Sequence, residues 1–177
     1  MFKNCSSLTQ APKLPATTLT SNCYQYMFNG CTSLTTAPEL PATTLDSSCY
    51  YYMFHDCKSL TQAPELPATN LANNCYTSMF SFCTSLKRIK MNASSGYWGT
   101  SMFEYCTSLE LVDMTGSIGV PNLSNVNNFS NTNDTYKIVV PDSLYNTWIA
   151  ATNWASIASH IMKQSDWNAA HPDDILW

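Results

Sequence analysis

Charge is the scarcest property of this 177-residue sequence. Asp, Glu, Lys and Arg make up 11% of it, well below the roughly 25% of a typical soluble domain. Only eight residues are Lys or Arg, the net charge is −4, and no basic run occurs. Because nucleic-acid binding requires clustered cations, we expect no nucleic-acid partner. The polar surface must come from Thr, Ser, Asn and Gln, which favours recognition by hydrogen bonding.

Long apolar runs and catalytic motifs are also missing. No stretch reaches the roughly 18 apolar residues of a membrane span, so we expect no membrane insertion. The eight cysteines form no Cys-x-x-Cys motif, and only three histidines accompany them, which predicts no metal site and no cofactor. We find no Gly-x-Ser-x-Gly, no Gly-rich phosphate loop and no paired catalytic carboxylates, so we expect the protein not to be an enzyme.

A tandem repeat is the dominant feature of the sequence. The dipeptide Met-Phe begins at Met1, Met27, Met53, Met79 and Met102, so the spacing is 26 residues three times and then 23. Cys-x-Ser-Leu follows each copy in step, and Ala-Pro-x-Leu-Pro-Ala-Thr occupies residues 11–17, 37–43 and 63–69. A single unit is too small to bury a core, so we predict that the units stack on one another.

Each unit divides into a half with helical spacing and an extended half. Leu45, Cys49, Met53 and Phe54 lie on one face of a helix, which predicts about three helical turns over 44–57. Residues 34–40 should be extended and form a short parallel strand before proline interrupts the pairing. Stacked cysteines with parallel side-chain vectors should be buried reduced thiols rather than disulfides.

The repeat pattern weakens toward the C-terminus, and we predict three parts. Residues 1–114 are repeats, 115–162 are an irregular coil followed by a C-terminal cap, and 163–177 are a tail. Within the cap we expect a strand at 137–141 and a helix from 142–143 to about 154, with a continuation through 157–162. The tail either packs through Trp167 or passes into a further domain. Because Met1 already occupies a repeat position, we expect the array to extend upstream of it.

The order of residues within the unit resembles the BspA-like leucine-rich repeat, whose unit runs Ile-Pro, Val, Ile-Gly, Ala-Phe, Cys and Leu. The matching residues here are Leu40-Pro41, Leu45, Cys49-Tyr50, Met53-Phe54, Cys57 and Leu60. Cys-Tyr in place of Ile-Gly is the departure from that pattern. The resemblance implies an α/β leucine-rich-repeat solenoid, with a short parallel strand and a short helix per coil and a capping strand and helix.

The same resemblance implies a non-enzymatic binding or adhesion module of a bacterial surface or secreted protein. Its partner would be a protein or a glycan, and its location extracellular or at the cell surface. The alternative is a structural spacer or appendage in a phage virion, in a tail or head fibre. The oligomeric state stays open.

Positions that vary between units, or that form outward rows, are the candidates for binding. We predict ligand contacts at the variable pairs and along a threonine row, together with a Gly-flanked loop: Gln25, Tyr26, Tyr51, Tyr52, Thr9, Thr35, Thr61, Tyr97 and Trp98. Exposed tyrosine is enriched at binding hot spots. For each group a structural alternative stays open: the tyrosines pack on a neighbouring coil, the threonines form a solvated ladder, and the loop packs into the core.

Overall fold

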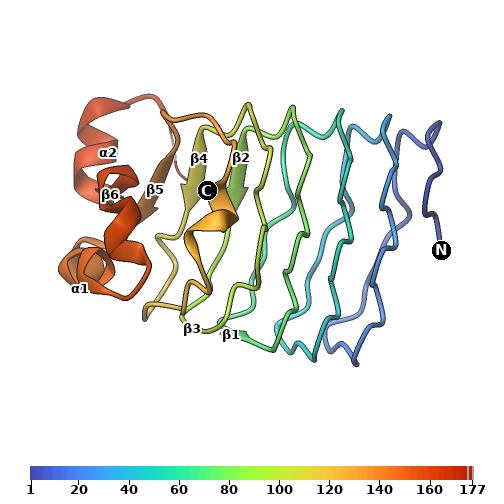
Figure 1. Cartoon of the computed structure of the whole chain (residues 1–177), viewed down its shortest axis with the longest axis horizontal. Helices are drawn as coiled ribbons and strands as arrows, with labels where there is room; N and C mark the ends of the chain where they lie inside the picture. Colours follow the sequence, from blue (N-terminus) through green and yellow to red (C-terminus); the bar gives the residue numbers. More distant parts are fainter. Residues whose placement is uncertain (175, 177) are drawn as a thin grey trace.

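The computed structural model describes residues 1–174 and residue 176. It shows coils of chain stacked side by side along one axis, with the N-terminus at one end and the helices of the C-terminal segment at the other (Figure 1). Neighbouring coils pair in parallel at equivalent repeat positions, for example Gln10 with Thr36 and Thr18 with Thr44. Each repeat therefore forms one coil of the stack.

The strands are short and parallel. Strand β1 (Asn70–Leu71) pairs with β3 (Ser95–Gly96). A second sheet has the order β2-β4-β5-β6, formed by β2 (Arg88–Lys90), β4 (Leu111–Asp113), β5 (Lys137–Val140) and β6 (Ile161–Lys163). In the first coils the expected strand is reduced to single bridges such as Gln10–Thr36, because proline supplies no N–H to extend the pairing.

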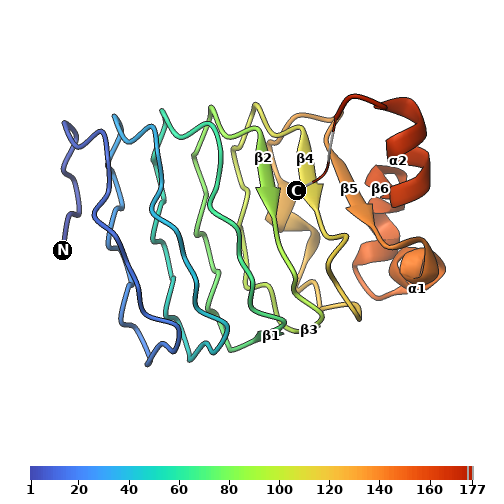
Figure 2. The same ribbon diagram turned by 180° about the vertical axis from the view of Figure 1, so that it is seen from behind.

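The predicted helix over 44–57 is wrong. Residues 47–56 form consecutive turns, and the coils before β2 carry no helical ribbon (Figure 2). Every fourth residue has a left-handed backbone, with φ of 54° at Ser48, 55° at Tyr52 and 62° at Asp56. An α-helix cannot contain such residues. The four-residue spacing of the apolar side chains is the period of these turns, not that of a helix.

Backbone hydrogen bonds in this segment alternate between two directions. The N–H of Tyr51 donates to the carbonyl of Ser48 three residues earlier, at 3.2 Å, and closes a turn. The N–H groups of Tyr50 and Tyr52 instead donate to the next coil, at 3.1 Å to Cys75 and 3.0 Å to Thr77. The same alternation recurs in residues 21–30 and 73–82. We call this arrangement the turn ladder; it satisfies backbone groups without a helix.

A column of phenylalanine rings runs through the core. Adjacent rings are 5.5–6.1 Å apart and nearly parallel, and the column consists of Phe2, Phe28, Phe54, Phe80, Phe103 and Phe129. Beside it, four cysteine thiols donate to phenylalanine carbonyls of the preceding coil at 3.0–3.2 Å. All eight cysteines are free, as expected, but Cys5 and Cys23 are exposed rather than buried.

The last coils are continued by mixed helical and extended segments. These are η1 (Val126–Phe129), η2 (Asp142–Leu144), α1 (Tyr145–Ala150), η3 (Trp154–His160) and α2 (Gln164–Ala170). The strand expected at 137–141 is present as β5. The helix expected to reach about 154 ends at Ala150, since Asn153 has a φ of 65°, and residues 161–162 lie in β6 rather than in a continued helix.

Tryptophans and the Arg88–Asp174 ion pair join this C-terminal segment to the repeats. Trp148 and Trp154 are buried, and Trp154 contacts Trp98 edge-to-face with ring centroids 5.1 Å apart. Trp167 of α2 is buried in a small cluster with Leu111 and Val139. The Arg88 guanidinium donates two hydrogen bonds to the Asp174 carboxylate, at 2.6 and 2.7 Å. Of the two alternatives for the tail, packing through Trp167 is observed as far as residue 174; Ile175 and Trp177 lie outside the described residues.

Candidate functional site

Aromatic side chains form a continuous strip across four neighbouring coils. The strip consists of Tyr26, Tyr51, Tyr52, His55, Phe82 and Tyr105. Its ring centroids follow one another at 5.3 Å from Tyr26 to Tyr52, 5.0 Å to His55, 5.4 Å to Phe82 and 4.5 Å to Tyr105. Tyr51 lies beside Tyr52 at 4.6 Å. We call this set the aromatic strip.

The turn ladder places these rings at the surface. Each strip residue lies in a turn segment that alternates with core residues such as Met53 and Phe54. Both Tyr51 and Tyr52 are half-buried, and Tyr105 is 39% exposed. One edge of the strip therefore packs on neighbouring coils while the other faces solvent. Neither Tyr51 nor Tyr52 is buried in the core.

Four members of the strip have an unusual backbone conformation. The φ values are 56° at Tyr26, 55° at Tyr52, 62° at Phe82 and 60° at Tyr105. Bulky residues rarely adopt this left-handed region, which Gly and Asn tolerate much better. At other left-handed positions of the same ladder the chain uses residues such as Asn22, Gly30 and Asn74. Aromatic rings at these positions are held at a conformational cost.

Electrostatically, the strip is aromatic surface with charges at its margins. The Lys3 ammonium lies 4.6 Å from the Tyr26 ring centroid, in cation–π geometry. Burial beside Tyr52 and Phe82 lowers the pKa of His55, and the carboxylates of Asp56 and Glu104 only partly oppose this effect. His55 is therefore neutral at pH 7. Burial likewise raises the pKa of Tyr51, with a further contribution from its tyrosine neighbours.

The structure brings some predicted residues together and separates others. Tyr26, Tyr51 and Tyr52 are joined in the strip, and Gln25 lies half-buried in the same turn segment. Thr9, Thr35 and Thr61 are exposed and lie outside it. Thr35 donates to the Thr9 carbonyl through both its N–H and its hydroxyl, at 3.2 Å each, so the threonine row carries hydrogen bonds between coils.

The two loop residues differ from each other. Tyr97 is 52% exposed and stands apart from the strip. Trp98 is fully buried and contacts the rings of Phe103, Phe129 and Trp154. For Trp98, the alternative of packing into the core is the one observed, and its side chain is not accessible to a ligand.

Three members of the strip were not predicted from the sequence: His55, Phe82 and Tyr105. A signal for two of them exists, since Phe82 and Tyr105 each stand directly before the cysteine of Cys-x-Ser-Leu. The equivalent residues in earlier units are Asn4, Gly30 and Asp56, so this position also varies between units and could have been grouped with the variable tyrosines.

Within residues 1–174 and 176, no three His, Cys, Asp or Glu side chains gather closely enough to hold a metal ion. No helix in that same part of the chain is long and apolar enough to cross a membrane.

Stacked repeat coils, parallel pairing between them, and inward leucines and cysteines at fixed offsets define a leucine-rich-repeat protein. The family model of the BspA type leucine rich repeat region matches residues 43–149 in six copies, and the chain belongs to that family. Repeats of this family are generally non-enzymatic scaffolds for protein binding. The chain matched no curated protein and no solved structure.

Proposed function

We propose that the chain is the ligand-binding module of an extracellular or surface-attached bacterial adhesion protein, and that the aromatic strip is its binding surface. The module is an open solenoid, and the segment from β5 to α2 caps its last coil. The ligand is a protein or a glycan on a host or on another cell. The observation that carries the proposal is the continuous strip of half-exposed rings across successive coils.

The physical properties of tyrosine favour the strip as the contact surface. Tyrosine offers a large amphipathic contact area with few rotatable bonds, so little entropy is lost on binding. Here the rings already pack against each other at 4.5–5.4 Å, which restricts them before any ligand arrives. The left-handed backbone at four strip residues also supports a functional role, because conformationally costly residues cluster at functional sites. These residues are Tyr26, Tyr52, Phe82 and Tyr105.

Replacing strip tyrosines by asparagine tests the proposal. Asparagine tolerates the left-handed backbone, so Tyr26→Asn and Tyr52→Asn remove the rings without straining the turns. Immobilised protein would be exposed to solubilised host-surface proteins and, separately, to a glycan array. Each hot-spot ring contributes about 2 kcal/mol, or roughly 30-fold in affinity, so the double variant should lose a ligand that wild type retains.

Tyr97→Asn is the matched control, because it removes an exposed tyrosine outside the strip. It should retain the ligand as wild type does. Circular dichroism would show whether wild type and the double variant are both folded. If both are folded and retain the ligand equally, the strip is not the binding surface. The identity of the retained material, protein or glycan, decides the ligand class.

A spacer or appendage in a phage virion is the second candidate, and the turn ladder favours it. Backbone hydrogen bonds cross from coil to coil throughout residues 21–30, 47–56 and 73–82, which makes the stack well suited to hold a fixed distance. This function is supported if the protein has a trimeric mass in solution and if substitutions in the aromatic strip cause no loss of ligand. A monomeric protein that loses its ligand when the strip is substituted contradicts the spacer function.

A further inference from the structure

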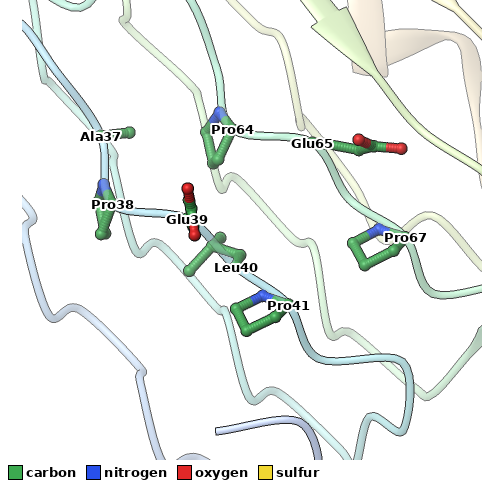
Figure 3. Close-up of a pocket in the computed structure, with 8 residues that line it drawn as sticks. All are labelled: Ala37, Pro38, Glu39, Leu40, Pro41, Pro64, Glu65 and Pro67. Atoms are coloured by element: carbon green, nitrogen blue, oxygen red, sulfur yellow. The ribbon is translucent and has the colours of Figure 1, made fainter. Parts of the chain in front are cut away.

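A groove separates two proline-rich segments on a different part of the stack from the aromatic strip. It lies between residues 37–41 and 64–67 and has a volume of about 410 Å³, within the usual range of ligand pockets. Figure 3 shows its lining residues: Ala37, Pro38, Glu39, Leu40, Pro41, Pro64, Glu65 and Pro67. A hollow lined by Thr35, Thr36, Thr61 and Gln62 adjoins it, sharing Ala37 and Pro64.

Proline explains why the coils stand apart here. Pro38, Pro41, Pro64 and Pro67 have no N–H, so a backbone ladder cannot form between these segments. In the described part of the chain, residues 37–42 make no backbone hydrogen bond at all. The groove is therefore dictated directly by the repeated Ala-Pro-x-Leu-Pro motif.

The next gap along the stack shows the opposite case. There residues 87–91 carry no proline, and the Ala63 and Leu66 N–H groups donate to the carbonyls of Arg88 and Lys90, at 3.1 and 3.0 Å. These bonds close the space that stays open one coil earlier. The groove is therefore a property of two adjacent coils that both carry the proline motif.

Charges along the stack distinguish this groove from its neighbours. The third residue of the Ala-Pro-x-Leu-Pro motif is Lys13, Glu39 and Glu65 in successive coils. In the next coil, which lacks the motif, Lys90 lies at the equivalent position, because Met91 pairs with Leu66. These four residues form a row. Lys13 and Glu39 line one hollow together, and Glu65 lies 3.5 Å from the Lys90 ammonium. Only the groove between Glu39 and Glu65, among the gaps of this row, has two carboxylates at its border.

Glu39 is the carboxylate available inside the groove. It is exposed, and no ion pair or hydrogen bond of its side chain occurs with the residues that the structure describes. Glu65 extends away from the 37–41 segment toward the next coil (Figure 3), where Lys90 is its partner. An apolar floor of proline rings beneath an unneutralised carboxylate suits a side chain with an apolar stem and a cationic head.

We infer that this groove binds an arginine or lysine side chain of a protein ligand, with the stem against Pro38, Pro41 and Pro64 and the head at Glu39. Arginine fits best, because its planar guanidinium can donate two hydrogen bonds to one carboxylate. The site is independent of the aromatic strip and provides a second point of contact for the same or another protein.

N-acetyl-arginine amide is the probe, and the intact chain is observed by two-dimensional amide NMR. Millimolar probe should shift the amide signals of Glu39, Leu40, Glu65 and Leu66. N-acetyl-norleucine amide, which has an apolar stem but no charge, should bind more weakly. Glu39→Gln should weaken arginine binding about three- to fivefold, the usual size of an exposed ion pair.

Two further variants make the result unambiguous. Glu65→Lys replaces a carboxylate at the border of the groove by a cation, so that the border carries one charge of each sign, as between Lys13 and Glu39, and should weaken arginine binding. Glu110→Gln removes an exposed carboxylate elsewhere and should leave binding unchanged, as should Tyr52→Asn in the strip. Equal affinity for the arginine and norleucine probes, an unchanged affinity in Glu39→Gln, or no shift at these amides would overturn the inference.

Discussion

Removing one ring from the middle of the phenylalanine column should destabilise the protein strongly. Phe54 is 0% exposed and stacks on Phe28 and Phe80 at 5.5 Å on each side. A buried Phe→Ala change costs about 3–5 kcal/mol. Each aromatic pair contributes about 0.5–1.5 kcal/mol beyond its buried area. Because Phe54→Ala breaks two pairs, we expect a loss near the upper end, about 4–5 kcal/mol.

The assay is urea denaturation followed by far-ultraviolet circular dichroism and, in parallel, by tryptophan fluorescence. The buried tryptophans lie in the C-terminal half, so the two signals report on different parts of the stack. Phe2→Ala is the matched control, since Phe2 is half-exposed and stacks on Phe28 alone. It should cost no more than about 1.5 kcal/mol. A loss under about 2 kcal/mol for Phe54→Ala would refute the continuous column.

Three further results are expected. In native protein a thiol reagent should label Cys5 and Cys23 rapidly and the other six cysteines only after denaturation; rapid labelling of all eight contradicts the buried thiol row. Because burial lowers the native pKa of His55 below its ordinary value of 6.5, the unfolded state binds the proton first, so stability should fall as pH drops below about 6.5. His55→Phe should flatten that dependence in urea titrations at several pH values, and an unchanged profile contradicts the assignment. Gly96→Ala should destabilise by more than about 1 kcal/mol in thermal melts, because Gly96 has a φ of 79° and an added Cβ would lie 2.1 Å from the Leu71 carbonyl oxygen.

The stacking of the repeats could be predicted from the sequence, whereas the conformation of each coil could not. Motifs at identical offsets require equivalent neighbours, which the pairing of Gln10 with Thr36 confirms. Apolar side chains at Leu45, Cys49 and Met53 have a spacing that a helix and a ladder of turns share. The difference lies in the left-handed residues and in N–H groups that reach the next coil, and these depend on contacts between distant residues.

The candidate surfaces were predictable in part for the same reason. Tyr26, Tyr51 and Tyr52 could be identified as variable tyrosines, but their contact with His55, and through it with Phe82, follows from the turn ladder. The proline motif was visible as a limit on strand length. That two such segments face each other and leave a groove becomes clear only when adjacent coils are placed together.

The most direct test of the binding surface is side-chain footprinting of the chain with its retained ligand. Hydroxyl radicals oxidise accessible aromatic rings, and mass spectrometry reads the extent at each residue. The proposed function predicts that ligand protects Tyr26, Tyr52, Phe82 and Tyr105 together and leaves Tyr97 as reactive as in the free protein. Protection of Tyr97, or none along the strip while ligand is bound, would contradict it.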